Sequence, residues 1–384
     1  MANYLKSSRS IGTIIVLLLL CMSLTDLVAA DGEDRGAESK SVPEFVGNIR
    51  EYWIAADEVM WDYAPSFPIN LMSGEEFTDD QKVFVEEGIG RTYLKSVYRE
   101  YTPGFGALIE RSEEENAYLG LLGPIIRAEV GETIIVHFKN NTRFPASIHP
   151  HGVFYTKTSE GARYNDGTEE SGKADDTVFP GSSYTYVWSV PRRAGPAKRD
   201  PSSIMWPYHS HVHTTADTNA GLIGAIIITR KGMANADGSP RDIDREFVSL
   251  FNVYDENVSN YLDVNLGNCT SGICDPDDED FQESNLMHGI NGLLWGNNTY
   301  TMNKGERVRW HVFAMGTEVD LHTPHWHGAT LKHNGNRVDV TEILPAASKS
   351  LTFRPDIAGT WMYHCHVNDH LDAGMMTVFT VLEN

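Results

Sequence analysis

The sequence has few cysteines and few basic residues for its length. It holds four cysteines in 384 residues, and its 53 acidic residues outnumber its 31 Lys and Arg residues, so the formal net charge is −22. A surface of this sign repels nucleic acid and attracts cations, which excludes nucleic acid as a partner. The length exceeds that of one small domain and suits two domains of middling size.

Long apolar runs are also missing, apart from one near the N-terminus. Lys6 and Arg9 precede the run from Ile11 to Leu20, and small residues follow it before Asp31. This pattern predicts a secretory signal peptide over residues 1–30; the run is short for a membrane span, and an uncleaved anchor is the alternative. We therefore expect a secreted, extracellular protein with no membrane span.

The cysteines leave one thiol without an obvious partner. Cys21 lies in the signal peptide, and Cys269 and Cys274 share a short polar loop in which they can pair after export. Cys365 then remains unpaired, and metal ligation would explain a free thiol in an oxidising compartment. Sequons for N-glycosylation, as expected of a secreted glycoprotein, begin at Asn140, Asn257, Asn268 and Asn297.

Short segments in which apolar and polar residues alternate fill most of the chain. GETIIVHFKN at 131–140 and GERVRWHVFAMG at 305–316 are examples. Such segments are typical of β-strands, and many short strands separated by turns favour an all-β sandwich or barrel. We predict an acidic flexible segment at 31–47, a first domain at 48–232, a polar linker, and a second domain at 241–384.

The two predicted domains resemble internal repeats. ASIHPHG at 146–152 aligns with HTPHWHG at 322–328, and YHSHVHTTADTNAGL at 208–222 aligns, with a gap, with YHCHVNDHLDAGM at 363–375. The first repeat has Ala146, Ser210 and Leu222 where the second has His322, Cys365 and Met375. One shared fold with unequal chemistry is the simplest explanation.

The second repeat carries the ligands of a blue-copper site. In a β-strand, Cys365 faces one way while His364 and His366 face the other. The thiolate of Cys365, imidazoles from His322 and His370, and a weak axial thioether from Met375 make the set that is typical of electron-transfer copper.

The remaining clustered imidazoles form four His-X-His pairs, two in each half. One such pair is often only a surface or core feature, but four pairs beside a blue-copper motif indicate a three-copper cluster that delivers four electrons to dioxygen. A single type 2 copper would use only three of these side chains. The pairs are His149 and His151, His209 and His211, His325 and His327, and His364 and His366.

These motifs resemble those of the multicopper oxidases, and the surrounding sequence is similar to the ceruloplasmin/hephaestin branch. Matching segments include GLLGPIIRAEVGE, EGARYNDGT, DIDREFVSLFNVYDEN, EDFQESNLMHGING and HCHVNDHLDAGM, within a resemblance from about Ile49 to Leu382. It implies two tandem cupredoxin-like Greek-key β-sandwiches. By motif position, type 2 copper takes His149 and His325, and the type 3 pair takes His151, His209, His211, His327, His364 and His366.

The size of the chain departs from that family pattern. Six such domains form a ring in ceruloplasmin-like proteins, with the cluster between a blue-copper domain and the following domain. The resemblance therefore implies a homotrimer in which the first-half histidines of one chain meet the second-half histidines of its neighbour. A two-domain nitrite reductase is also a trimer, but it needs only one interfacial type 2 copper.

The resemblance also implies ferrous iron as the reductant. Glu283, His288, Asp369 and Glu318 match motif positions that bind ferrous iron beside the blue copper, the glutamate of the last motif coming from the adjacent unit. Carboxylates with one imidazole suit iron and favour the ferric product. The expected function is a ferroxidase that reduces dioxygen; the alternatives are a laccase-like oxidase of phenols or aromatic amines, and a non-catalytic copper-binding extracellular module.

A calcium site in the first domain is implied by the same resemblance. The family positions correspond to Lys157, Asp175, Asp176 and the backbone carbonyl of Gly172. Paired aspartates with carbonyl oxygens suit a hard cation. The alternative is a loop with two solvated aspartates.

Overall fold

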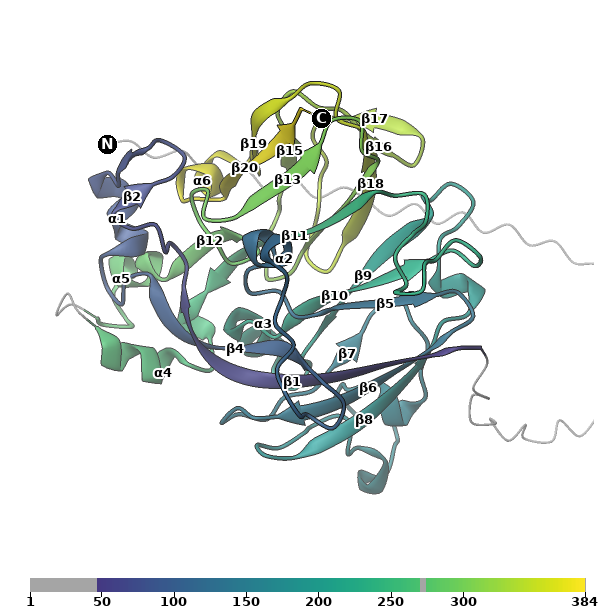
Figure 1. The fold of residues 1–384 in the computed structure, drawn as a ribbon. Helices are drawn as coiled ribbons and strands as arrows, with labels where there is room; N and C mark the ends of the chain where they lie inside the picture. The colour runs from purple at the N-terminus through teal and green to yellow at the C-terminus, as the bar shows by residue number, and fades with distance from the viewer. Residues whose placement is uncertain (1–46, 270–273, 384) are drawn as a thin grey trace, which may run out of the picture. The chain divides into compact units, whose positions relative to one another are not determined.

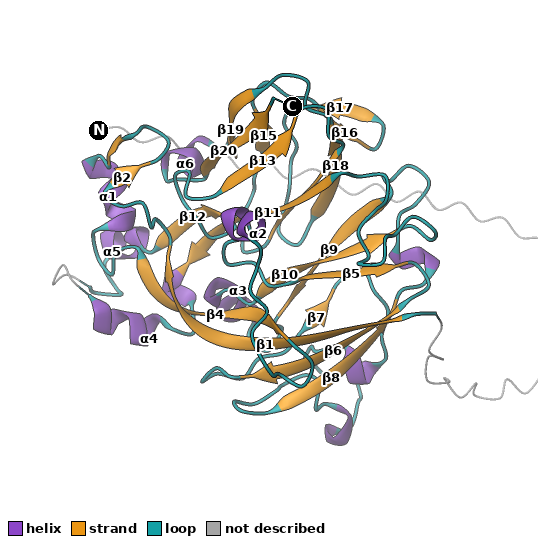
Figure 2. Ribbon diagram, in the orientation of Figure 1, coloured by secondary structure: helices purple, strands orange, loops and turns teal. Residues whose placement is uncertain are grey.

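Two β-sandwiches make up the part of the chain that the computed structural model describes, residues 47–269 and 274–383 (Figure 1). Strands dominate both, and the helices are short (Figure 2). The all-β prediction is confirmed. The predicted signal peptide and residues 31–46 lie outside the described ranges.

The first sandwich pairs two four-stranded sheets. One sheet has the order β4-β1-β6-β8, with β1 at Ile49–Asp62, β4 at Thr92–Tyr101, β6 at Thr133–Asn140 and β8 at Ser183–Ser189. The other has the order β5-β10-β9-β7, with β5 at Ile125–Glu129, β7 at His149–Pro150, β9 at Ser203–His209 and β10 at Ile223–Thr229.

The second sandwich repeats this arrangement with a longer first sheet. That sheet has the order β12-β11-β14-β18-β16-β17, with β11 at Arg245–Asp255, β12 at Leu286–Ile290, β14 at Val308–Ala314, β16 at Leu331–His333, β17 at Asn336–Val338 and β18 at Ser348–Phe353. The other has the order β13-β20-β19-β15, with β13 at Thr299–Asn303, β15 at Pro324–Trp326, β19 at Gly359–Cys365 and β20 at Met376–Leu382.

The strand pairing supports the predicted internal repeat. In each sandwich, the strand that comes first in the sequence pairs in parallel with a neighbouring strand of the same sheet. These pairs are β1 with β6 and β11 with β14. In each, the strand that follows the second His-X-His pair runs parallel to an early strand, β10 with β5 and β20 with β13. The histidine motifs therefore occupy equivalent places in equivalent sheets.

The remaining elements are short. A small sheet pairs β2 at Ile69–Asn70 with β3 at Glu75–Glu76. The helices are α1 at Asp79–Val85, α2 at Glu113–Tyr118, α3 at Thr214–Ala220, α4 at Leu262–Asn265, α5 at Glu279–Ser284 and α6 at Asn368–Asp372, with 3-10 turns η1 at Lys157–Ser159, η2 at Glu170–Gly172, η3 at Arg192–Ala194, η4 at Glu256–Val258 and η5 at Leu266–Asn268. None of these described helices has the length and hydropathy that crossing a membrane requires.

The cysteines follow the prediction. Cys269 is joined to Cys274, and Cys365 is free and buried. The sequons are less uniform than their sequences suggest, because the buried Asn140 donates its side-chain amide to the carbonyls of Phe144 and Val178. In the folded chain that amide nitrogen is already engaged.

A buried ion pair joins the two halves of the chain. The Lys95 ammonium on β4 contacts the Glu256 carboxylate on η4 and donates to the carbonyl of Asn219 at 2.7 Å. The hydroxyl of Tyr63 donates to the same carboxylate at 2.6 Å. Lys95 and Glu256 are fully buried, so neither charge has water as an alternative partner.

We expect Lys95→Met to destabilise the protein by about 3–5 kcal/mol, because it leaves the Glu256 charge buried and unpaired. The double variant Lys95→Met/Glu256→Gln removes both charges and should recover most of that loss. Chemical denaturation measures the free energy of unfolding for both. If the double variant is as unstable as the single variant, the unpaired charge of Glu256 is not the cause of the destabilisation.

Candidate metal centre

Strand β19 positions two chemically different groups on its two faces. It ends at Cys365, and its register with β15 places His364 opposite His325 and Cys365 opposite Pro324. Because side chains alternate along a strand, His364 faces the histidines of β15 while the sulfur of Cys365 points to the other side.

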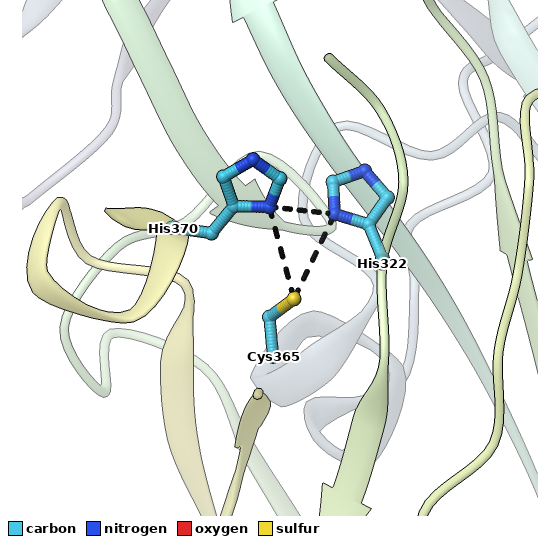
Figure 3. A group of neighbouring side chains, drawn as sticks. All are labelled: His322, Cys365 and His370. Atoms are coloured by element: carbon cyan, nitrogen blue, oxygen red, sulfur yellow. Dashed lines mark hydrogen bonds between the residues drawn. The ribbon is translucent and has the colours of Figure 1, made fainter. Parts of the chain in front are cut away.

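On the sulfur side, three ligand side chains point toward one another (Figure 3). The Nδ1 atoms of His322 and His370 are 3.1 Å apart, and the Sγ atom of Cys365 lies 3.9 Å from the first and 3.7 Å from the second. His322, Cys365 and His370 are at most 7% exposed. Two imidazole nitrogens about 3 Å apart beside a thiol match the spacing of ligands that share one ion at roughly 2 Å.

Met375 belongs to the same closed loop. Its backbone N–H donates to the carbonyl of His370 at 2.9 Å, and its carbonyl accepts from the N–H of Cys365 at 3.0 Å. Its side chain is fully buried. A thiolate and two imidazoles are soft and borderline donors, so the three assembled side chains fit copper, and Met375 is the residue that would add a thioether.

Asp320 was not anticipated from the sequence, although it lies two residues before His322. Its Oδ1 is 3.0 Å from His322 Nε2 and accepts the N–H of Val253 at 2.8 Å, while its Oδ2 accepts the N–H of Thr317 at 2.9 Å. A carboxylate on Nε2 favours the tautomer in which Nδ1 is free to bind a metal. Asp320 lies in the loop between β14 and β15, so no strand pattern in the sequence marks it as a neighbour of His322.

The thiol of Cys365 is prepared to lose its proton. Burial raises its pKa, but hydrogen bonds to His322, His370 and the N–H of Thr323 outweigh burial and lower the pKa to about 6. Burial lowers the pKa of His322, but Asp320 and Cys365 outweigh that effect, so the pKa of His322 is raised. The pair therefore favours a thiolate beside an imidazolium in the absence of a metal.

On the opposite face of β19, the second-half histidines form a group. Ligand nitrogens of His325, His327 and His364 lie within 4.8 Å of one another, and the ring of His366 is 5.4 Å from those of His325 and His364. Nδ1 of His364 is 2.7 Å from the carbonyl of Cys365, which leaves its Nε2 for a metal. Burial is the main reason that the pKa of His364 falls to about 4.

The first-half histidines also lie near one another, although no three of them bring ligand nitrogens within 4.8 Å of one another. Nε2 of His151 is 3.1 Å from Nε2 of His209, and the ring centroids of His149 and His211 are 5.1 Å apart. Nδ1 of His209 is 2.9 Å from the carbonyl of Ser210, as Nδ1 of His364 is from that of Cys365. Burial lowers the pKa of His151 to about 4 and that of His209 to about 3, so both are neutral at pH 7.

The first half has a loop with the same backbone hydrogen bonds as the loop from Cys365 to Met375, but without the predicted copper ligands. Leu222 donates its N–H to Asp217 as Met375 does to His370, and Ser210 donates to Leu222 as Cys365 does to Met375. Ser210 Oγ donates to Asp217 Oδ2 at 2.7 Å. A hydrogen-bonded pair therefore stands where the second half has a thiol and an imidazole.

The two histidine groups do not meet within one chain. Over residues 47–269 and 274–383, no hydrogen bond or ring contact joins a first-half histidine to a second-half histidine. Each group is partly open to solvent, and His366 is exposed.

The side chains predicted to bind iron are only partly assembled. The ring of His288 lies 5.3 Å from that of His370 and is 8% exposed. Glu283, Asp369 and Glu318 are exposed, and no three of the four predicted residues form a ligand group within 4.8 Å among the described side chains. Of these four side chains, only the imidazole of His288 is buried beside the predicted blue-copper ligands.

The predicted calcium residues show one feature of a cation site. Asp175 is fully buried, and its Oδ1 has no hydrogen-bond partner. Burial and then the charge of Asp175 raise the pKa of Asp176 to about 6. The Lys157 ammonium pairs with Asp166 at 2.7 Å, so only the backbone of Lys157 could bind a cation. Gly172 ends the 3-10 turn η2.

Comparison with known proteins gives the same result for both halves. Residues 119–232 and residues 270–384 match two family models, each described as multicopper oxidase.

Similar curated proteins are much longer than this chain. It is 41% identical over 345 residues to hephaestin of Rattus norvegicus, 42% over 346 residues to ferroxidase HEPHL1 of Homo sapiens, and 40% over 343 residues to ceruloplasmin of Mus musculus. The alignments cover 87%, 88% and 87% of this chain but 30%, 30% and 32% of those proteins. The chain therefore spans less than a third of the length of these relatives.

Solved structures share the fold at low sequence identity. A multicopper oxidase crystal structure is 19% identical with a TM-score of 0.56, covering 88% of this chain and 92% of that one. A copper nitrite reductase from Nitrosomonas europaea is 16% identical with a TM-score of 0.55, covering 87% of this chain and 94% of that one.

We expect copper binding at Cys365 to weaken as the pH falls, because protons compete with the metal for His322, whose pKa is raised. Below the thiol pKa of about 6, protons compete for the sulfur as well, and the affinity should fall by about tenfold or more per pH unit. Competition titrations of the metal-free chain between pH 8 and pH 5 measure this. Asp320→Asn removes a charge that raises the pKa of His322, so its curve should be shallower; an identical curve would contradict the assigned role of Asp320.

Proposed function

Because the chain belongs to the multicopper oxidase family, we propose that it is a ferroxidase, which oxidises Fe(II) at a blue copper and passes the electrons to dioxygen at a three-copper cluster. The observation that carries the proposal is the placement of two ligand groups on the two faces of β19, one containing sulfur and one built from imidazoles. Copper would supply one-electron transfer at the first group and dioxygen reduction at the second.

The chain's own residues provide the connection between the groups. Cys365 is bonded through the backbone to His364 and His366, so the sulfur ligand and two cluster ligands are a few covalent bonds apart. The core around them is dry and aromatic, since the buried rings of Tyr363 and Trp326 stack at 5.0 Å. Such an environment excludes water from the path between the two groups.

The entrance for iron is proposed beside His370. The ring of His288 lies against that of His370, and Nδ1 of His288 is 2.9 Å from the carbonyl of Leu286, which leaves Nε2 for a metal ion. The exposed carboxylates of Glu283 and Asp369 flank these two histidines in the sequence and can rotate toward a bound cation. Glu318, also exposed, is proposed to reach the iron site of an adjacent unit.

The dioxygen site is proposed to be shared between chains. Four of the eight imidazoles lie in the first half of the chain and four in the second half. The two groups do not meet within one chain. A head-to-tail ring would join the first-half group of one copy to the second-half group of the next, and closed cyclic symmetry would give equal clusters. Three two-domain chains would supply the six domains of the ring that the resemblance implies, so the proposed assembly is a homotrimer.

Two further features belong to the proposal. The N-terminal residues 1–30 have the pattern of a signal peptide, so we place the activity outside the cell. The buried, unpartnered oxygen of Asp175 supports a calcium ion in the first half.

We expect Glu283→Ala/His288→Ala to lose most ferrous oxidation while retaining the visible absorption of blue copper, because neither side chain belongs to the copper ligand set. Oxygen uptake with ferrous iron and with an aromatic diamine measures the effect, and the diamine rate should stay within about threefold of the wild-type rate. Glu279→Ala, on the same helix as Glu283, is the matched control. Unchanged iron turnover in the double variant would favour the laccase-like alternative.

We expect sedimentation to give about three times the mass of one chain. Two inactive variants provide a sharper measurement: His151→Ala/His209→Ala damages the first-half group, and His327→Ala/His366→Ala damages the second. If clusters form between copies, dissociating and reassembling an equal mixture should create about a quarter of intact clusters and restore part of the oxygen uptake. A fully copper-loaded, active monomer would contradict the assembly.

A further inference from the structure

A chain of hydrogen bonds connects the predicted calcium site to the first-half histidines. Asp175 has no exposed surface, and its two carboxylate oxygens have different surroundings. Oδ2 accepts the backbone N–H groups of Glu160 at 3.0 Å and Gly161 at 2.9 Å. Oδ1 has no partner, which is costly for a buried carboxylate oxygen and indicates a missing positive ligand.

The first branch of the chain reaches His149. The carbonyl oxygen of Glu160 lies 2.6 Å from His149 Nδ1, so the ring donates to it and keeps Nε2 free for copper. Glu160 thus contacts both residues through its backbone: its N–H donates to Asp175, and its carbonyl accepts from His149. A shift of Asp175 would move the atom that orients the imidazole.

The second branch reaches His211. The carbonyl of Gly161 accepts from Ser147 Oγ at 2.7 Å, and Ser147 Oγ accepts the backbone N–H of His211 at 3.0 Å. Gly161 has a φ of 69°, and a Cβ there would lie 2.4 Å from the carbonyl oxygen of Ile148, so only glycine fits at this position. Each branch consists of one or two hydrogen bonds beyond Asp175.

The charges around Asp175 and Asp176 leave room for one more cation. Lys157 pairs with Asp166 and with the carboxylate of Glu160, and Lys173 lies 3.5 Å from Asp166. Among the described residues, neither lysine ammonium has a hydrogen bond or ion pair to the carboxylate of Asp175 or Asp176. The charges of these two buried aspartates are thus not neutralised by a direct ion pair in the metal-free chain.

We propose that a divalent cation bound at Asp175 Oδ1 and copper bound at the first-half histidines strengthen each other's binding, with Asp175 and the Glu160 peptide as the positioning groups between them. The cation fixes the Asp175 carboxylate, which fixes the Glu160 and Gly161 peptides, and these hold His149 and His211 in the orientation that binds copper. The inference rests on the proposed copper role of His149. Because linkage is reciprocal, copper must raise calcium affinity by the same factor by which calcium raises copper affinity.

The test is calorimetric titration of calcium into the full chain, first free of copper and then loaded with copper. We expect calcium to bind about fivefold or more tightly to the copper-loaded chain. His149→Ala should show a smaller difference in calcium affinity between the two states, because it removes the first branch and leaves the second. Glu160→Gln keeps the peptide and changes only the side chain, so it should retain the difference.

Each other outcome overturns a separate statement. Equal calcium affinity in the copper-free and copper-loaded wild-type chain would overturn the coupling while leaving the proposed function intact. Failure of calcium to bind either state would overturn the cation site. Failure of the wild-type chain to bind copper at the first-half histidines would overturn the proposed function together with this inference.

Discussion

The alternation of side chains along strand β19 is the constraint on which the rest of the site depends. Consecutive residues of a strand point to opposite faces, so Cys365 cannot face the same way as His364. The pairing of His364 with His325 fixes which face receives the imidazoles. The sulfur is thereby directed toward His322 and His370. The sulfur group and the imidazole group thus lie on opposite faces of one strand, and adjacent residues of that strand connect them covalently.

The first sandwich shows that this loop does not need a metal to close. Ser210, Asp217 and Leu222 make the same backbone hydrogen bonds as Cys365, His370 and Met375, yet they supply no copper ligands. A hydroxyl-to-carboxylate hydrogen bond fills the space instead. The scaffold is therefore stabilised by its own packing and hydrogen bonding, and the ligand residues are placed on a backbone that already has the required path.

The sequence predicted the parts of the site that depend on short-range order. Cys365, His370 and Met375 lie close together in the chain, and strand alternation was enough to divide the histidines between two faces. Long-range pairs such as Lys95 with Glu256 could not be predicted, because nothing near either residue indicates its partner. The proposed iron-binding residues were predicted from resemblance alone, and their carboxylates are exposed, so packing does not fix their positions. The eight imidazoles can be counted in the sequence, but the sequence does not tell which of them would share a metal ion.

The burial of Cys365 has a consequence for the chain before it acquires copper. A thiol with a pKa of about 6 is largely a thiolate at neutral pH, the form that reacts with oxidants and with other thiols. Yet Cys365 has no exposed surface and is the one free cysteine among the described residues. An activated nucleophile is thus enclosed where neither glutathione nor a second chain can contact it. In the metal-free chain the sulfur ligand is thus kept from contact with dissolved thiols and disulfides.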